Sequence, residues 1–182
     1  MPLRPLHLLG SPVLRERSAE VAGLDDEVRA LIDDMFETMD AAQGVGLAAN
    51  QVGVARRVAV IDAEGQRFAM VNPVLVEVSG RATGEEGCLS IPDIYGEVTR
   101  PERVVLEALG RDGEPFRLEA QGLTARAIQH EIDHLDGILF LDHLGPIRRK
   151  MLLARWKKDH RGDPSYIKPV KPRPARADAP AD

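Results

Sequence analysis

The sequence has 182 residues, 43% of them hydrophobic and 29% charged, which is typical of one globular domain with its own hydrophobic core. The net charge of −5 is uneven, because residues 148–182 carry a net +7 and the remaining part carries a net −12. No apolar run approaches the roughly 20 residues that span a bilayer, which excludes a membrane protein. Only the basic C-terminal part suits a polyanion, so we expect no DNA partner for the acidic body.

The N-terminus and the cysteine content predict a cytoplasmic protein. The first apolar run is too short for a signal-peptide core, and Pro2 and Pro5 interrupt it. Cys88 is the only cysteine, which excludes an internal disulfide and suits a reducing compartment. A lone cysteine is most often a small buried hydrophobe, so a chemical role for Cys88 needs further support.

The first predicted element is an amphipathic helix from Asp25 to about Ala42. Three acidic residues at 25–27 occupy its first turn, where the helix dipole favours negative charge. Its apolar residues recur at helical spacing: Val28, Leu31, Ile32, Met35, Phe36 and Met39. Two β-hairpins follow. The segments RRVAVID and RFAMV flank AEGQ, and RVVLEALG and PFRLEA flank RDGE, so each pair of strands meets at a glycine turn.

The C-terminal half returns to helical pattern. A helix is predicted from Leu123 through the HEIDH segment to Gly137, a favourable residue for the left-handed cap. A last helix begins near Pro146 and carries apolar residues up to Trp156. Residues 163–182 are basic and rich in proline and alanine, which predicts a flexible extension. Strands between one early and two late helices predict a single α+β domain over residues 1–162, with antiparallel or mixed sheets packed around the HEIDH helix.

HEIDH, at residues 130–134, has the spacing of a metal site. Residues four apart lie on one face of a helix, so His130 and His134 can both point at one ion. Glu131 lies beside them, able to reach a metal-bound water without ligating the metal itself. Two histidines still leave the third protein ligand to be identified.

The downstream sequence offers no recognised third ligand. One class of zinc proteases has the pattern HExxHxxGxxH, but Phe140 stands where the last histidine would be. Another class uses a downstream glutamate, and Glu131 is the last glutamate of the chain. His143 and His160 remain, with no recognised spacing to support them. A zinc endopeptidase is therefore an alternative that needs a ligand such as His143.

An upstream ligand fits better. Cys88 lies in EEGCLSIP, 42 residues before His130, and its thiolate could complete a Cys-His-His set with water in the fourth position. Three protein ligands with one open position are typical of catalytic zinc, whereas structural zinc is closed by four. On this pattern alone a buried, unreactive Cys88 remains an alternative.

The stretch GVGLAANQVG, residues 44–53, superficially matches a dinucleotide-binding fingerprint. That fingerprint needs a strand before it and a helix after it, and here the order is reversed. The glycines could instead let the backbone approach a ligand closely, with the Gln51 amide near the site. By itself the stretch is explained equally simply as a turn, which is the interpretation we favour from these residues alone.

Taken together, the three segments resemble a known family. GVGLAANQVG, EGCLSIP and QHEIDHLDGILF occur in the order of the signature motifs of the peptide deformylases, and the similarity covers roughly residues 2 to 160. The resemblance implies a bacterial-type, metal-dependent hydrolase that removes the formyl group from the N-terminal formyl-methionine of new polypeptides. In its mechanism, metal-activated water attacks the formyl carbon.

The resemblance also implies roles for individual residues. Cys88, His130 and His134 would bind the metal, and Glu131 would be the general acid/base. Gln51 and the backbone N–H of Leu89 would stabilise the oxyanion. The positions that would line the substrate groove are Gly44, Val45, Gly46, Glu86, Gly87, Arg126 and Ala127. Some relatives have a substrate-contacting arginine three residues beyond the proline of EGCLSIP, where this chain has Tyr95.

Cofactor and partners follow from the same residues. Sulfur and nitrogen ligands suit Zn2+, whereas the resemblance implies Fe2+ as the working ion, with Ni2+ or Co2+ also accepted. The expected partners are N-formyl-methionyl nascent peptides, and the basic last helix could dock on the ribosome. A different class of protein stays open: a ribosome- or nucleic-acid-binding module whose metal is structural, which would need a fourth protein ligand.

Overall fold

The computed structural model describes residues 2–163 and 165–174. Its helices are α1 (Asp26–Ala41), α2 (Gly122–Leu135) and α3 (Pro146–Asp159), with short 3-10 helices at Pro12–Arg15, Ala49–Val52 and Phe140–His143. Its strands are β1 (Leu6–His7), β2 (Gly46–Ala48), β3 (Val58–Ala63), β4 (Gln66–Ser79), β5 (Ala82–Cys88), β6 (Ile91–Arg100), β7 (Arg103–Leu109), β8 (Pro115–Gln121) and β9 (Ile167–Lys168).

The largest sheet is antiparallel, with the strand order β2-β3-β4-β7-β8. It contains both predicted hairpins, β3–β4 and β7–β8, which are confirmed. The long strand β4 pairs with β3 through its first half and with β7 through its second, and the register shifts between Val71 and Val74 and again between Leu75 and Glu77. β2 is an edge strand of this sheet, a feature that matters for the site.

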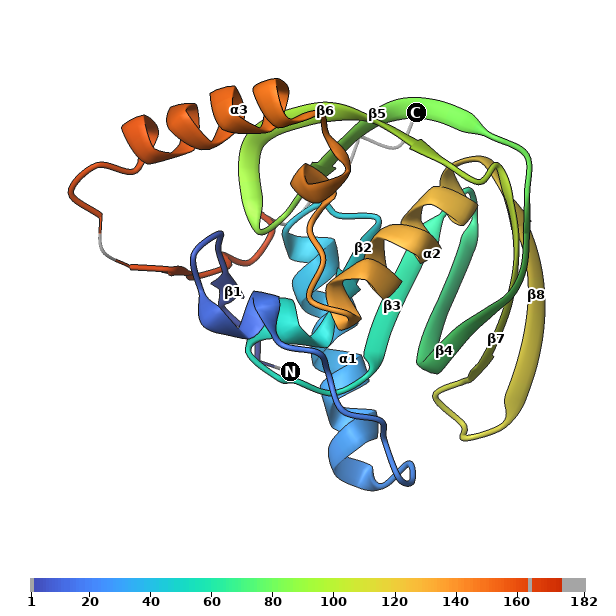
Figure 1. The fold of residues 1–182 in the computed structure, drawn as a ribbon. Coiled ribbons are helices and arrows are strands. Elements are labelled where there is room, and N and C mark those ends of the chain that lie inside the picture. Colours follow the sequence, from blue (N-terminus) through green and yellow to red (C-terminus); the bar gives the residue numbers. More distant parts are fainter. Residues whose placement is uncertain (1, 164, 175–182) are drawn as a thin grey trace, which may run out of the picture.

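This sheet is covered by one helix on each face. Successive residues of a strand point to opposite faces, and β3 is buried on both. Val58 and Val60 pack in the cluster that contains the apolar face of α1, whereas Ala59 and Ile61 pack with the apolar residues of α2. Figure 1 shows α2 crossing in front of β3 and β4, with α1 behind. The α+β prediction, with a central helix that carries HEIDH, is confirmed.

The helix ends follow the sequence signals. The Asp25 side chain caps α1 by accepting a hydrogen bond from the N–H of Val28 at 2.9 Å. Gly137 follows α2 with a φ of +75°, and a Cβ there would lie 2.7 Å from the carbonyl oxygen of Arg15, so only glycine fits. Pro146 occupies the first turn of α3.

A third hairpin, β5–β6, was not among the predicted strands. It is antiparallel, with a register shift between Glu86 and Cys88, and it passes above α2 in Figure 1. Burial along the middle of β6 alternates, but two of the buried positions hold Gly96 and Arg100. Because these residues are not apolar, the alternation that identifies a strand is hidden in the sequence.

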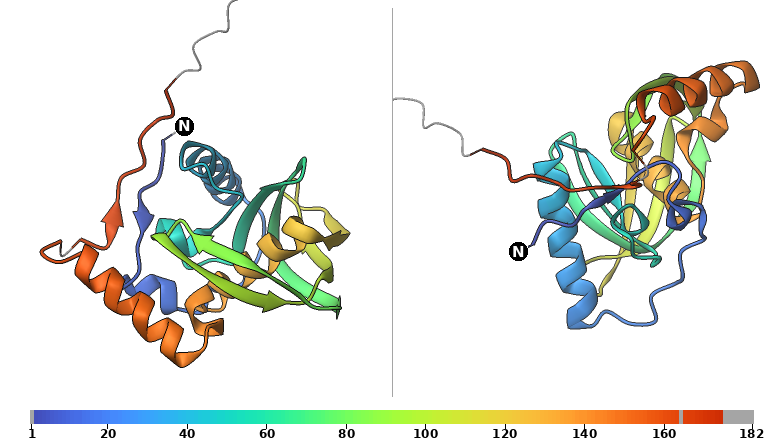
Figure 2. Two further views of the ribbon diagram at one scale, coloured as in Figure 1. Left: turned by 90° about the horizontal axis from the view of Figure 1, so that it is seen from above. Right: turned by 90° about the vertical axis from the view of Figure 1, so that its left-hand side faces the viewer.

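Part of the C-terminal extension that the sequence predicts lies beside the N-terminal strand β1. β9 pairs with β1, with Lys168 opposite Leu6 and Ile167 opposite His7, and the N–H of Leu8 donates to the carbonyl of Tyr166. Figure 2 shows the segment running beside β1. Residues 175–182, the end of the predicted extension, lie outside the described residues. In the described part of the chain, every helix is too short or too polar to cross a membrane.

Candidate active site

Two segments far apart in the sequence bring their potential ligands to one point. α2 turns both histidines of HEIDH to the same side, and β5 ends at Cys88 beside them. The Cys88 sulfur lies 3.3 Å from Nε2 of His134, which in turn lies 3.1 Å from Nε2 of His130. The three donor atoms lie within 4.8 Å of one another, and both histidines are buried. One sulfur and two imidazole nitrogens so arranged fit a single metal ion.

The orientation of His130 is set by Glu86. The Nδ1 of His130 lies 2.9 Å from Oε1 of Glu86, so Nδ1 carries the hydrogen and Nε2 faces the other two donors. Burial lowers the pKa of His130, but the hydrogen bonds to Cys88 and Glu86 raise it above the ordinary value. Burial lowers the pKa of His134 well below its ordinary value, which favours the neutral form that binds metal.

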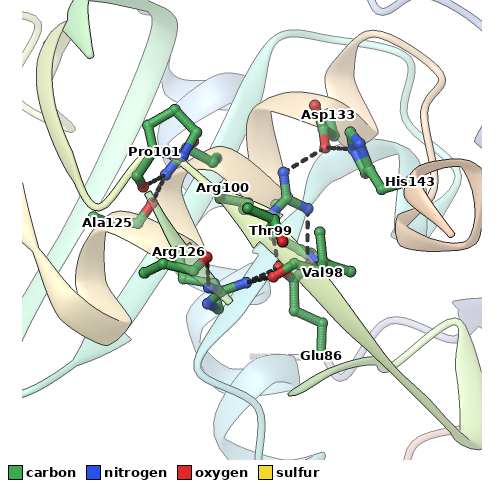
Figure 3. A network of polar contacts seen from close by, with 12 residues as sticks. Glu86, Val98, Thr99, Arg100, Pro101, Ala125, Arg126, Asp133 and His143 are labelled. Atoms are coloured by element: carbon green, nitrogen blue, oxygen red, sulfur yellow. Dashed lines mark hydrogen bonds and ion pairs between the residues drawn. The ribbon is translucent and has the colours of Figure 1, made fainter. Parts of the chain in front are cut away.

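Glu86 is held by two arginines as well. Arg100 donates to both of its carboxylate oxygens at 2.6 and 2.8 Å, and Arg126 donates to one at 2.7 Å (Figure 3). Burial raises the pKa of Glu86, but the hydrogen bonds from Arg100 and His130 outweigh it and hold the pKa well below its usual range. The carboxylate is therefore charged and fixed at neutral pH.

The network continues outward along α2. Arg100 also donates to Asp133 at 2.8 Å, and Nε2 of His143 lies 2.7 Å from the same carboxylate oxygen (Figure 3). His143 thus lies at the outer end of the network and is not a member of the Cys-His-His group. Phe140, at the position of the third ligand in the HExxHxxGxxH pattern, stacks against the His130 ring at 6.3 Å between centroids. Both observations disfavour the endopeptidase alternative.

Glu131 has the opposite surroundings. It is buried, and its Oε2 has no hydrogen-bond partner within residues 2–163 and 165–174. Burial raises the pKa of Glu131 to about 7. A Cβ on Gly46 would lie 2.6 Å from its Oε1, so the carboxylate lies directly against the β2 backbone. A carboxyl group with a pKa near neutrality can both accept and release a proton at pH 7.

Gln51 is fixed by hydrogen bonds at both ends of its amide. Its Oε1 accepts from the N–H of Ala48 at 2.9 Å, which defines Nε2 as the end that points to the site. Nε2 donates to the Ser90 hydroxyl at 3.1 Å and lies 3.5 Å from the Cys88 sulfur. The adjacent Asn50 donates to the carbonyl of His134 at 2.6 Å and ties this loop to the end of α2.

These residues lie in a groove of about 760 Å³. The predicted groove residues Gly44, Val45, Gly46, Glu86, Gly87, Arg126 and Ala127 all line it, together with Gln51, Cys88, Leu89, His130 and Glu131. His134 is not in its lining. Arg126 lines the groove, but its guanidinium already has partners within the protein, because it donates to Glu86 and to the carbonyls of Val98 and Ala82. Tyr95 also lines the groove, with its ring against Gly87.

Sequence reasoning missed most of the supporting residues. Glu86 was predicted only as a groove residue, and Arg100, Asp133, Asn50 and Ser90 were not singled out. A buried arginine in a strand has no pattern that separates it from an exposed one. The nearest signal was the alternation around Val98 in β6, which places position 100 on the buried face.

Comparison with known proteins agrees with this geometry. Residues 3–150 match the family described as polypeptide deformylase. The chain is 52% identical over 151 residues to the peptide deformylase of Alkalilimnicola ehrlichii, covering 81% of this chain and 85% of that protein. It is 53% identical over 159 residues to peptide deformylase 1 of Corynebacterium efficiens, covering 85% and 94%.

Solved structures give the same result. The crystal structure of a peptide deformylase from Legionella pneumophila has a TM-score of 0.84 and 43% sequence identity, covering 88% of this chain and 96% of that one. The deformylase from Ehrlichia chaffeensis, crystallised in complex with actinonin, also has a TM-score of 0.84, with 38% identity and coverage of 88% and 99%.

An α+β fold whose HExxH helix meets a cysteine from a neighbouring hairpin defines a metal-dependent hydrolase. With the matches above, the assignment is specific. The chain belongs to the polypeptide deformylase family.

Proposed function

We propose that the chain hydrolyses the formyl group from the N-terminal formyl-methionine of newly synthesised polypeptides, using one divalent metal ion. The observation that carries this is the Cys88-His130-His134 group at the groove, with the buried Glu131 beside it. Family membership and the actinonin complex of the Ehrlichia relative support the same activity. We propose that residues 1–162 form the catalytic domain.

We propose that Cys88, His130 and His134 hold Fe2+ in the working enzyme. Zn2+, Ni2+ and Co2+ suit the same mixture of sulfur and imidazole donors. When bound, such an ion supplies Lewis acidity, which lowers the pKa of water from about 16 to about 7. Glu86 supports the site by keeping the Nε2 lone pair of His130 turned toward the other donors.

Glu131 is the proposed general acid/base. Its Oε2, which has no hydrogen-bond partner in the part of the chain that the structure describes, takes a proton from the water that attacks the formyl carbon, and passes it to the amine as the carbon–nitrogen bond breaks. Formate and a free N-terminal amine result. The pKa of about 7 suits both halves of this task, because the carboxyl group is neither a very weak base nor a very weak acid at neutral pH.

The proposed oxyanion donors are the Gln51 amide and the N–H of Leu89. The hydrogen bond from Ala48 to Oε1 leaves Nε2 of Gln51 facing the site, so no reorientation is needed when charge develops on the formyl oxygen. A preorganised donor of this kind is worth roughly 3–4 kcal/mol in the transition state.

Substrate binding is proposed to follow strand addition. β2 is an edge strand, and an extended peptide can add to such an edge through main-chain hydrogen bonds. Only glycine fits at positions 44 and 46, since a Cβ on Gly44 would lie 2.7 Å from a Leu89 methyl group and a Cβ on Gly46 would lie 2.6 Å from Oε1 of Glu131. Gly87 and Ala127 also line the groove and have little or no side chain to narrow it. The methionine side chain enters the apolar part of the groove.

The test is formate release from a formyl-methionyl peptide. Wild-type protein is loaded with ferrous iron without oxygen, and Glu131→Ala is measured beside it at equal metal content. We expect rapid release by the wild type and almost none by the variant, with the metal retained in both. No release from fully metallated wild type would contradict the proposed activity, and near-normal release by the variant would contradict the role of Glu131.

Metal content provides a second test. Cys88→Ala is expected to lose metal during dialysis, whereas wild type keeps it. Unchanged metal content in Cys88→Ala would remove this cysteine from the site.

We also propose that α3 contacts the ribosome. It carries Arg148, Arg149, Lys150, Arg155, Lys157 and Lys158, and two exposed apolar residues, Ile147 and Met151. Leu152 and Trp156 pack in the core, so removing the helix would damage the fold as well as any docking. Replacing the exposed basic residues by glutamine is the cleaner experiment. It should weaken ribosome binding and reduce its salt dependence; equal binding by this variant and wild type would contradict the contact.

A further inference from the structure

The segment Tyr166–Lys171 is anchored to the body of the protein. β9 pairs with β1, and the Tyr166 carbonyl accepts from the N–H of Leu8 at 2.6 Å. The Tyr166 ring covers Gly10, where a Cβ would lie 2.4 Å from Cε1 of the ring. Val170 packs against the main hydrophobic cluster. Backbone pairing at one end and apolar contact at the other fix the segment between them.

This segment forms part of the groove that contains the metal-binding group. Lys168, Pro169, Val170 and Lys171 are consecutive, and all four line the groove together with Leu6 of β1. They lie beyond residues 3–150, which match the family. A groove wall formed by these residues therefore lies outside the part of the chain that matches the family. Figure 2 shows the segment following β1 along this side of the molecule.

The segment brings positive charge to the groove. Lys168 and Lys171 are exposed, and neither makes an ion pair within the described residues. Arg126, the other basic side chain of the lining apart from His130, is already paired with Glu86. Lys168 and Lys171 are thus the positively charged side chains of this groove that remain available to form an ion pair with a ligand.

Negative charge enters the groove from a different element. Glu85 and Asp93 belong to the β5–β6 hairpin and also line the groove. An extended peptide presents successive side chains to opposite sides. A side chain directed at the C-terminal segment therefore meets lysines, while its neighbour faces away. Charge selection should depend on position along the peptide.

We propose that Tyr166–Lys171 is a specificity-determining wall, and that Lys168 and Lys171 favour peptides with an acidic side chain at one position after the formyl-methionine. This inference rests on the proposed deformylation. Exposed ion pairs are weak, so the expected preference for aspartate over asparagine is about 2- to 5-fold in kcat/KM at low salt. It should fall as salt rises, because exposed charges are screened.

The test uses full-length, metal-loaded enzyme and C-terminally amidated formyl-methionyl tetrapeptides. Aspartate, asparagine or lysine is placed in turn at the second, third and fourth positions, with alanine elsewhere. Wild type is compared with Lys168→Gln/Lys171→Gln and with Lys150→Gln/Lys158→Gln, which makes the same charge change on α3 outside the groove. The all-alanine peptide reports the activity of each protein without a charged side chain.

We expect the aspartate preference of wild type, measured as the ratio of kcat/KM for aspartate over asparagine, to persist in the α3 variant and to vanish in Lys168→Gln/Lys171→Gln, while the all-alanine peptide is hydrolysed equally by wild type and the α3 variant. In Lys168→Glu/Lys171→Glu the preference should reverse toward lysine. Hydrolysis of the all-alanine peptide with no aspartate preference, or with the same preference after removal of both lysines, would overturn this inference alone. No hydrolysis of any peptide by wild type would overturn the proposed function itself.

Discussion

Two buried carboxylates lie at the same site in opposite surroundings. Glu86, on the β5–β6 hairpin, is surrounded by Arg100, Arg126 and His130, and its pKa is held well below the ordinary value. Glu131, on α2, has one oxygen without a partner among the described residues, and burial raises its pKa to about 7. One carboxylate is permanently charged and the other can exchange protons near neutrality.

The difference shows that the same type of side chain stabilises the structure at one position and is suited to a reaction at the other. A charged carboxylate that satisfies several cations stabilises its surroundings and stays where it is. A buried carboxylate with few partners costs stability when ionised, and is kept for a reaction. We expect glutamine to affect the two positions in opposite ways, with activity lost at one and stability lost at the other.

The largest expected effect is on turnover in Glu131→Gln. Removing the acid/base should lower kcat by roughly 10²- to 10⁴-fold. The metal-free variant should unfold no more easily than metal-free wild type at pH 7, because the burial cost of an ionisable group is gone. Formate release and urea denaturation measure the two quantities. A large loss of stability with modest loss of turnover would make Glu131 a structural residue.

Glu86→Gln should mainly reduce stability. It leaves the buried Arg100 and the partly buried Arg126 without their shared anion, and breaking a buried pair such as Arg100–Glu86 costs about 3 kcal/mol or more. Loss of the partner to His130 should also weaken metal affinity by about 10- to 100-fold. The adjacent, exposed Glu85→Gln is the matched control, with an expected change within about 0.5 kcal/mol. Similar denaturation curves for both variants would remove the distinction.

The pH dependence of stability should have opposite signs at the two positions in the metal-free protein. The pKa of Glu86 is lowered when the chain folds, so its contribution is present above its ordinary pKa of 4.5 and lost as the pH falls below it. The pKa of Glu131 is raised to about 7, so its contribution is present below pH 4.5 and lost as the pH rises through 7.

Urea denaturation from pH 3 to pH 9 separates these contributions. The stability difference between wild type and Glu86→Gln should shrink below pH 4.5. The difference between wild type and Glu131→Gln should change between pH 4.5 and 7, by at most about 3 kcal/mol. Parallel curves for wild type and either variant would show that folding does not shift the pKa of that carboxyl group.

The smallest effect is expected at the outer end of the network. His143→Ala removes a partly exposed contact to Asp133, so the stability change should stay below about 1 kcal/mol. Metal content should equal that of wild type, as measured by atomic absorption after dialysis. Metal loss in this variant would revive the endopeptidase alternative, in which His143 is a ligand.

The sequence predicted the framework because its signals are local. The apolar spacing of α1, the glycine after α2 and the proline that begins α3 each act within a few residues of their own helix. The glycine turns did the same for β3–β4 and β7–β8. The β5–β6 hairpin was missed because Gly96 and Arg100 occupy buried positions, and the reason for burying Arg100 lies in Glu86 and Asp133.

The candidate site likewise contains residues whose roles the sequence predicts and residues whose roles it does not. His130 and His134 were predicted from the HExxH spacing, whereas Cys88 was assigned as the third ligand only through the family resemblance; the structure brings all three residues together. Arg126 was expected to face the substrate, yet most of its hydrogen-bonding capacity is used inside the protein. A side chain on the right element can still bind its neighbours instead, and only the tertiary structure decides between them.

The C-terminal segment makes contacts that its amino-acid composition does not predict. Residues 163–174 contain few apolar side chains and several prolines, a composition that predicts an unstructured chain. Two backbone pairs with β1, the Tyr166 ring on Gly10 and the contact of Val170 with the core are enough to place it. These are contacts between the two ends of the chain, which no window of sequence contains.

The edge position of β2 bears on the time at which a polypeptide could bind in the groove. The strand is only three residues long and borders a groove, so a folded protein with a broad sheet cannot pair with it. A single extended chain end can. A polypeptide whose first residues already belong to a helix or a sheet has no backbone groups left to offer. If substrates bind by the proposed strand addition, the groove admits an N-terminus only while that N-terminus is unfolded, so its processing has to precede the formation of the first helix or strand of the new protein.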